Sequence, residues 1–289
     1  MKKVNLLITI DRNYILPSII MIDSYKKSHP QIYTEVFIAH STLTENDINF
    51  ISSETQTDYL HVSSIYITEK WFTDTPVIER LPQESFFRLM AFQYLPRDME
   101  RCLYIDPDVY INNNLLPLYN LDMGSNYIVA ASHLRGLHNK INILRLGMKE
   151  TPRYINSGVM LMNLHQIRKD FTVNKITDSL DIYSHLLLLG DQDLINIIFD
   201  GKIYLVDETI YNLDEKTVKK NKHKIDKSYI TNKTVIIHYN GKYKPWLKGY
   251  KGILDRYYPY IENKAAMPKR KIRHQIKSII DIVTSFDNK

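Results

Sequence analysis

Leu103-Tyr104-Ile105-Asp106-Pro107-Asp108 is an apolar run that ends in two carboxylates one residue apart. The apolar part predicts a buried strand. Two neighbouring carboxylates repel each other, and each raises the pKa of the other. A hard divalent cation converts that repulsion into binding, because such cations prefer carboxylate oxygens. The segment therefore predicts a strand whose carboxyl end holds a cation through Asp106 and Asp108, although a turn or a helix N-cap also accommodates such a triplet.

Further strand-like runs alternate with helical patterns along the chain. The predicted strands cover residues 4–10, 36–38, 60–67, 102–105, 127–131, 158–162, 203–206 and 235–238. The predicted helices cover residues 15–27, 82–95, 171–189 and 191–199. This alternation predicts an α/β fold with helices on both faces of the sheet. Residues 216–233 are rich in lysine and lack periodicity, so we expect an exposed loop or a loose two-stranded excursion there.

Length and composition favour one large domain, with or without an appendage. The chain has 289 residues, of which 44% are hydrophobic, enough to bury a sizeable core. The only early apolar run, residues 6–10, is too short for a signal peptide, and no run approaches the ~20 residues that span a bilayer. The single cysteine, Cys102, lies inside a predicted strand, which indicates a core residue in a reducing cytosol.

Positive charge is concentrated in the last 26 residues. Residues 264–289 carry seven basic and two acidic side chains, which is +5 of the net charge of +6. Apolar residues recur there at helical spacing after Pro268: Ile272, Ile276, Ile279, Ile280 and Val283. We therefore predict a domain of residues 1–263 and a basic amphipathic tail, whose residues 267–289 bind an anionic membrane surface or pack on protein. The nearly neutral body argues against a nucleic-acid partner.

A second predicted strand ends in His238 and offers a third metal ligand. The sequence contains no glycine-rich phosphate loop, so a bound nucleotide would need a metal and cationic side chains. Imidazole and two carboxylates suit Mn²⁺. Gly241 would let backbone approach a ligand, and Lys244 suits a phosphate. His238 would otherwise be an ordinary histidine at a strand end.

Four other segments place polar residues at element boundaries. Asp11 and Asn13 follow the first strand, where they would either cap a helix or contact a base or ribose. Arg88 lies on an otherwise apolar helix, so it reaches solvent or meets an anion. Asn156 precedes an apolar run. Asp191-Gln192-Asp193 opens a helix, where the carboxylates would favour the positive end of the dipole.

Together, these segments resemble glycosyltransferase family 8, which contains bacterial lipooligosaccharide galactosyl- and glucosyltransferases, general stress protein A-like proteins and glycogenin. The likeness covers roughly residues 4–250, with the motifs in the family's order. It implies a single Rossmann-like nucleotide-diphospho-sugar transferase domain of the GT-A type with a mixed, mostly parallel sheet. It also implies an enzyme that transfers a hexose with retention of anomeric configuration.

The first three motifs concern the nucleotide and the metal. Asp11 and Asn13 stand where the family's Asp-Asp-Asn-Tyr binds uridine, although Arg12 replaces the usual second aspartate. Arg88 matches the helix arginine that contacts the sugar nucleotide. Asp106 and Asp108 match the metal-binding Asp-x-Asp.

The remaining motifs concern the donor sugar and the diphosphate. Asn156 begins a segment like the family's Asn-(Ser/Ala)-Gly-Val beside the donor sugar. Asp191 and Gln192 match the pair next to the reacting centre and are the candidate catalytic residues. The segment from His238 to Trp246 matches His-x-x-Gly-x-x-Lys-Pro-Trp, which contains Gly241 and Lys244.

The resemblance implies a cation, a donor and an acceptor. Asp106, Asp108 and His238 would hold Mn²⁺, with Mg²⁺ as the alternative. The donor would be UDP-galactose or UDP-glucose and the acceptor a glycan or lipid-linked glycan, with the protein cytoplasmic and peripheral at the inner face of the cell membrane. Two other functions remain open: a non-catalytic sugar-nucleotide-binding stress protein, and a haloacid dehalogenase-type phosphatase whose nucleophile is the first aspartate of the triplet.

Overall fold

The computed structural model describes residues 3–68, 86–247 and 250–259. The chain divides into two compact units, Met1–Gly241 and Lys242–Lys289. In the second unit, Trp246 packs on Tyr258 with ring centroids 5.9 Å apart, beside the 3₁₀ helix η6 (Asp255–Tyr257). The predicted boundary between residues 263 and 264 and the predicted tail helix lie outside the described residues.

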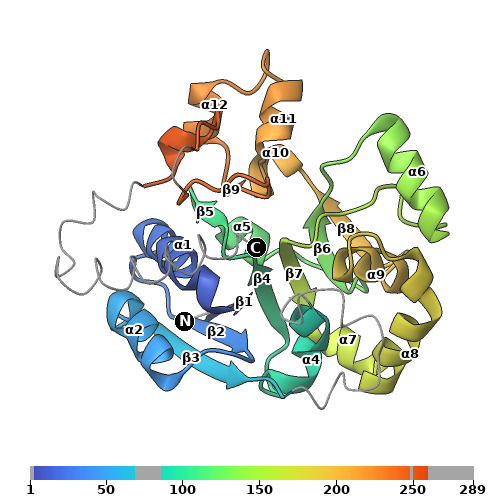
Figure 1. Ribbon diagram of the computed structural model, residues 1–289, viewed down its shortest axis with the longest axis horizontal. Coiled ribbons are helices and arrows are strands. Elements are labelled where there is room, and N and C mark those ends of the chain that lie inside the picture. Colours follow the sequence, from blue (N-terminus) through green and yellow to red (C-terminus); the bar gives the residue numbers. More distant parts are fainter. Residues whose placement is uncertain (1–2, 69–85, 248–249, 260–289) are drawn as a thin grey trace, which may run out of the picture. The chain divides into compact units, whose positions relative to one another are not determined.

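The first unit is built on a seven-stranded sheet in the order β3-β2-β1-β4-β7-β6-β8 (Figure 1). Strands β1, β2, β3 and β4 run parallel, β7 runs antiparallel to both β4 and β6, and β8 is parallel to β6. This confirms the predicted α/β fold with a mixed, mostly parallel sheet. The strands are β1 (Val4–Thr9), β2 (Thr34–His40), β3 (Leu60–Tyr66), β4 (Arg101–Ile105), β6 (Ile128–Ala131), β7 (Val159–Asn163) and β8 (Ile203–Val206).

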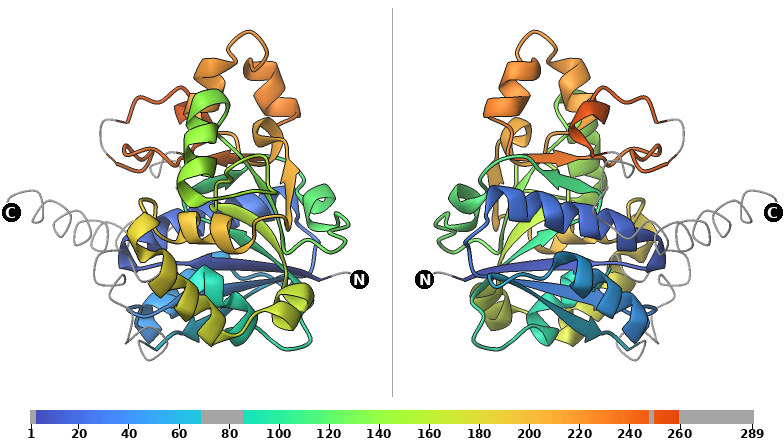
Figure 2. Two further views of the ribbon diagram at one scale, coloured as in Figure 1. Left: turned by 90° about the vertical axis from the view of Figure 1, so that its right-hand side faces the viewer. Right: turned by 90° about the vertical axis from the view of Figure 1, so that its left-hand side faces the viewer.

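Helices cover both faces of this sheet (Figures 1 and 2). On one face, α1 (Ile15–Ser28) packs beside α2 (Glu45–Thr55). On the other face, a continuous core joins strand residues such as Leu7, Tyr104 and Met160 to buried residues of four helices. These helices are α4 (Ala91–Tyr94), α7 (Leu164–Asp170), α8 (Val173–Tyr183) and α9 (Asp191–Ile198).

A small second sheet joins two distant parts of the chain. Strand β5 (Val109–Ile111) pairs antiparallel with β9 (Ile236–His238), and Val109 lies opposite His238. Short helices connect these strands to the main sheet: α5 (Leu116–Tyr119), α10 (Glu208–Tyr211), α11 (Glu215–Lys220) and α12 (Lys227–Asn232). This pairing places the end of β9 beside the loop that follows β4.

Two predictions need correction: a loop that is helical in the structure, and a helix with different bounds. The loop predicted over residues 216–233 is wrong, because α11 and α12 form there, capped by the carboxylates of Asp214 and Asp226. Helices of six residues are too short to show a 3.6-residue period. The helix predicted over residues 171–189 starts at Val173 and gives way at Ser184 to the 3₁₀ helix η5 (Ser184–Leu186).

Other predicted helices agree with the structure within the described residues. The helix over 15–27 is α1 and that over 191–199 is α9. In the described part of the helix over 82–95, the α-helical residues Phe86 and Phe87 lead into the 3₁₀ helix η4 (Arg88–Met90), which is followed by α4. Helices α2, α7 and α6 (Gly136–Leu146) were not predicted from the sequence. Among the described residues, none of the helices combines the length and apolar character that crossing a bilayer requires.

Candidate active site

Asp106, Asp108 and His238 converge at the carboxyl end of β4. Asp106 follows β4 directly, and Asp108 precedes β5, which is paired with the strand that ends in His238. His238 Nε2 lies 3.2 Å from Asp108 Oδ1 and 3.8 Å from Asp106 Oδ2. One potential ligand atom from each residue lies within 4.8 Å of the other two. The structure thus brings together the three predicted metal ligands.

The backbone around this cluster fits a bound cation. A Cβ atom on Gly158 would stand 2.3 Å from His238 Cε1 and 2.5 Å from Asp106 Oδ2, so only glycine leaves the ligand side chains their space. Asp106 N donates to Gly158 O across 2.7 Å, which holds the two backbones together. Two carboxylates and an imidazole are a donor set that divalent cations accept. These residues therefore fit a divalent metal.

Arg88 links the metal cluster to the start of α9. It is 8% exposed, and its Nη1 donates to Asp106 Oδ1 and to Ser157 O, both at 3.0 Å. Its Nε lies 3.0 Å from Asp191 Oδ2. Burial opposes the guanidinium charge, but the two carboxylates outweigh it and raise the pKa of Arg88 above its usual value. Of the two possibilities left open by the sequence, Arg88 meets anions.

Asp191 is the first residue of α9 and is 7% exposed. Burial raises its pKa to about 6, although Arg88 opposes the shift. Gly190, whose φ of +55° suits glycine, precedes the helix. Asp193 is the carboxylate that fixes this end of α9, because it accepts from Leu188 N, Leu189 N and Arg145. Asp191 is thus buried beside Arg88 and also accepts from the first backbone amides of α9.

An amide network joins Gln192 to Asn156. Gln192 Oε1 accepts from Asn156 Nδ2 at 2.9 Å and from Ser157 N at 3.1 Å, and Gln192 Nε2 donates to Tyr154 OH at 2.9 Å. Because β7 is antiparallel to β4, the residues just before β7 lie at the carboxyl end of β4. The fold therefore gathers Asn156, Gln192 and the metal cluster at one edge of the sheet.

Asp11 and Asn13 form a local cap. Asp11 Oδ1 accepts from Asn13 N at 2.8 Å and Oδ2 accepts from Asn13 Nδ2 at 3.1 Å, which caps the 3₁₀ helix η1 (Arg12–Tyr14). Arg12, the departure from the family motif, pairs with Asp47 at 3.1 Å. Tyr14 lies near the metal cluster: burial, then Asp108 and Asp106, raise the pKa of its phenol.

Gly241 and Lys244 belong to different units. Gly241 is an exposed residue at the end of the first unit. Lys244 lies in the second unit, with its Nζ 5.8 Å from the centre of the Trp246 ring. Their predicted contacts with the nucleotide sugar stay predictions.

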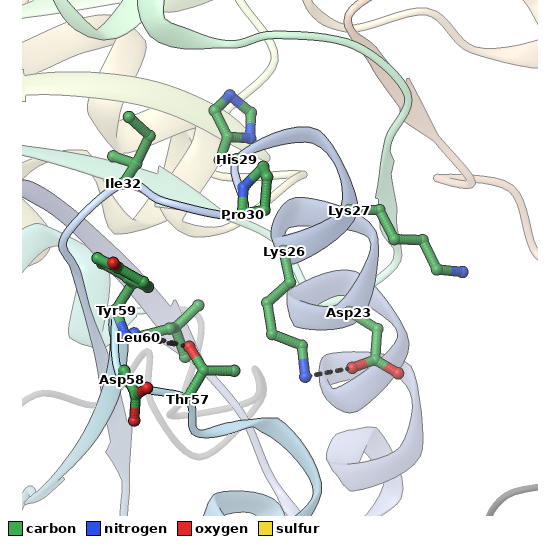
Figure 3. Close-up of a pocket in the computed structure, with 10 residues that line it drawn as sticks. All are labelled: Asp23, Lys26, Lys27, His29, Pro30, Ile32, Thr57, Asp58, Tyr59 and Leu60. Carbon is green, nitrogen blue, oxygen red and sulfur yellow. Dashed lines mark hydrogen bonds and ion pairs between the residues drawn. The ribbon is translucent and has the colours of Figure 1, made fainter.

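A pocket elsewhere in the first unit contains none of the candidate site residues (Figure 3). It lies between the end of α1 and the start of β3, at the amino end of the parallel strands. Lys26 pairs with Asp23 at its edge across 2.9 Å. Ligands of open α/β sheets bind at the carboxyl ends of strands, which separates this pocket from the candidate site.

The sequence profile of glycosyl transferase family 8 matches residues 5–249. The chain belongs to glycosyltransferase family 8. This confirms the resemblance drawn from the sequence motifs and makes the protein a glycosyltransferase. The haloacid dehalogenase alternative is set aside, since the family accounts for the triplet and for the motifs around it.

Relatives of this family 8 chain include two lipopolysaccharide hexosyltransferases and a general stress protein. It is 26% identical over 243 residues to a lipopolysaccharide 1,2-glucosyltransferase of Escherichia coli K12, covering 83% of this chain and 71% of the relative. It is 24% identical to a lipopolysaccharide 1,3-galactosyltransferase of Salmonella typhimurium, covering 84% and 73%. General stress protein A of Bacillus subtilis is 24% identical over 74% of this chain and 72% of its own.

A solved structure shows the same fold. The galactosyltransferase LgtC, crystallised with donor and acceptor sugar analogues, superposes with a TM-score of 0.77 at 19% identity, covering 94% of this chain and all of LgtC. The GT-A fold predicted from the resemblance is thereby confirmed.

Sequence reasoning missed several residues that contact the site. Tyr104 donates to Asp106 Oδ1 at 2.6 Å, Ser157 contributes its carbonyl to Arg88, and Asn212 contacts His238 Nδ1 at 2.8 Å. Tyr104 lies in the apolar run before Asp106, where its sequence context predicts only a buried strand residue. Asn212 stands in a segment without a recognisable motif, so only the folded structure reveals it.

Proposed function

We propose that this protein is a retaining hexosyltransferase that transfers galactose or glucose from a UDP-sugar to a glycan or lipid-linked acceptor. The observation that carries the proposal is the convergence of Asp106, Asp108 and His238 beside the Arg88–Asp191 pair. The hexoses named for its lipopolysaccharide-modifying relatives support the donor class.

The proposed cofactor is Mn²⁺, held by Asp106, Asp108 and His238. Imidazole among the ligands favours Mn²⁺ over Mg²⁺, which prefers oxygen donors throughout. When bound, the cation supplies Lewis-acid stabilisation of the negative charge that grows on the departing diphosphate. Lys244 would add a second positive charge.

The residues around the metal cluster would orient the donor sugar. Above its pKa of about 6, Asp191 is a carboxylate able to accept from sugar hydroxyls, and Arg88 holds it in place. Gln192 is fixed by three hydrogen bonds, and an amide is a poor nucleophile. These properties support attack on the same face of the sugar.

In that reaction the bond between the anomeric carbon and the phosphate oxygen breaks as the acceptor oxygen bonds to that carbon. The leaving phosphate oxygen takes the acceptor's proton. A trapped glycosyl adduct on Asp191 or Gln192 would contradict this course.

The test is a screen of UDP-sugars with the purified protein, measuring UDP release with Mn²⁺, with Mg²⁺ and with excess chelator. We expect Mn²⁺-dependent release with UDP-galactose or UDP-glucose. Asp106→Asn or Asp108→Asn should lower the rate on the order of 10³-fold, because metal electrostatics contribute several kcal/mol. Asp178→Asn, at an exposed carboxylate on α8, is the matched control. Full activity of either site variant in chelator would refute the proposal, and binding of UDP-sugar without any turnover would support a non-catalytic stress protein.

We also propose that residues 267–289 bring the enzyme to the inner face of the cell membrane, where a lipid-linked acceptor would be. Basic residues near an anionic surface each contribute ~1 kcal/mol. Reversing Lys269, Arg270 and Lys271 to glutamate should therefore weaken binding to phosphatidylglycerol vesicles by at least about 100-fold. The control reverses three exposed lysines of the body, Lys220, Lys222 and Lys224. Equal losses in both variants would contradict a role for the tail.

A further inference from the structure

We infer that Asn212 is a positioning residue that fixes the protonation of His238, so that the unprotonated Nε2 faces the cation. The inference rests on the proposed metal site. Asn212 is fully buried, and its Oδ1 lies 2.8 Å from His238 Nδ1. An amide oxygen carries no proton, so Nδ1 must donate. In a neutral imidazole the lone pair then stands on Nε2, the atom that faces Asp106 and Asp108.

The orientation of the Asn212 amide follows from a backbone donor. Gly158 N can only donate, and it contacts Asn156 Oδ1 at 3.1 Å, which identifies that atom as the oxygen. Asn212 contacts the same oxygen at 3.0 Å and must therefore present its NH₂ group there. The remaining atom of the Asn212 amide, its oxygen, faces His238. The tautomer of His238 is thus imposed by the chain around it.

A second backbone donor checks the orientation of Asn156. Ser157 N donates to Gln192 Oε1, so this atom of Gln192 is also an oxygen. Asn156 contacts it at 2.9 Å and must present its NH₂ group, which leaves its oxygen toward Gly158 and Asn212. Two independent backbone groups therefore require the same arrangement.

The backbone of the next residue holds Asn212 beside His238. The following residue, Leu213, donates to Ile236 O at 2.9 Å and accepts from His238 N at 2.8 Å. His133 Nε2 lies 2.5 Å from Asn212 O on another side. The residue is thus fixed against β9, the strand that carries the third ligand.

The first measurement needs no variant. In metal-free wild-type protein, ¹⁵N NMR of the labelled His238 ring should show the proton of the neutral imidazole on Nδ1, the atom that faces Asn212. This NMR measurement requires no bound metal and no catalysis. It therefore tests the role of Asn212 separately from the proposed function. A neutral ring that carries its proton on Nε2 and none on Nδ1 would overturn the inference.

Variants test the consequence for metal binding by Mn²⁺ titration with electron paramagnetic resonance. Asn212→Leu removes the acceptor and should weaken Mn²⁺ binding by about 10–100-fold, the usual effect of losing an outer partner of a metal-bound histidine. Asn212→Asp keeps an acceptor for Nδ1–H and should bind Mn²⁺ more tightly than Asn212→Leu.

The matched control is Asn139→Leu. Asn139 is also buried, but among the described residues its side chain bonds to the backbone of Pro152 and Tyr154 and not to the metal cluster. Equal Mn²⁺ affinities of the two leucine variants would overturn the inference. A different outcome tests the metal site itself. If Asp108→Asn leaves Mn²⁺ binding intact, the proposed metal site is wrong, and the proposed metal-dependent function is contradicted with it.

Discussion

Gly158 leaves space for the side chains of the proposed metal site because glycine has no Cβ atom. A methyl group there would overlap His238 Cε1 and Asp106 Oδ2. We predict that Gly158→Ala displaces these ligands and lowers both Mn²⁺ affinity and the transfer rate by at least about 10-fold, since ligand orientation governs metal binding. Isothermal titration with Mn²⁺ would measure the first effect and UDP release the second.

Gly147→Ala is the control for this prediction. Gly147 ends α6 with a φ of +66°, and a Cβ there meets nothing within 4 Å. Its replacement should cost about 1 kcal/mol of folding stability through backbone strain while leaving Mn²⁺ affinity unchanged. Normal Mn²⁺ binding by Gly158→Ala would show that the ligands tolerate the methyl group.

At the residue scale, the sequence predicted the side chains whose chemistry is unusual for their setting. Arg88 on an apolar helix and two adjacent carboxylates after an apolar strand are such cases. Tyr104 and Asn212 were not predictable, because a strand tyrosine and a lone asparagine are ordinary in sequence. Their contacts depend on which elements the fold places beside them.

At the scale of elements, the buried carboxylate of Asp193 holds the segment before α9 to the helix. Asp193 is fully buried and accepts from Arg145, Tyr154 OH, Leu188 N and Leu189 N. Burial alone would raise its pKa, but these donors lower it below the ordinary value. Asp193→Asn should therefore destabilise the protein by about 3 kcal/mol at neutral pH, because it leaves Arg145 without its anionic partner.

The pH dependence of that loss follows from the sign of the shift. A carboxylate with a lowered pKa in the folded state stabilises the protein above its unfolded pKa of about 3.9. The contribution disappears as pH falls through the folded pKa. Urea unfolding at several pH values should show a large difference between wild type and Asp193→Asn above about pH 5, narrowing below about pH 4. A constant difference would mean that the carboxylate charge is not responsible.

Elements with strong local signals were predicted, and elements with weak ones were not. The buried strands β1, β4 and β7 are apolar runs, and α1 and α9 show clear helical spacing. The short helix α12 depends on the cap from Asp226 and on packing of Ile230. The lysine-rich sequence around these two residues shows no helical pattern that would predict the helix. Strands β5 and β9 are far apart in the sequence, so no local sequence pattern predicts their pairing.

At the scale of the whole molecule, the proposed metal ligands come from distant parts of the first unit. His238 stands about 130 residues after Asp106. A cation held by both binds only the folded chain, so Mn²⁺ at 100 times its dissociation constant should stabilise the protein by about 2.7 kcal/mol. This corresponds to a rise of roughly 5–10 °C in Tm. Differential scanning fluorimetry with Mn²⁺ or with chelator would measure it, and Asp106→Asn should show no rise.

The same pairing of β5 with β9 sets an order of events during synthesis on the ribosome. The two aspartates leave the exit tunnel long before His238, and β1, β2 and β4 are complete by then. The long loop between β5 and β9 must close before the third ligand arrives, which makes this pairing a late event. A nascent chain that stops short of β9 carries all seven strands of the main sheet but lacks His238, so the proposed metal site can be completed only after translation has passed residue 238.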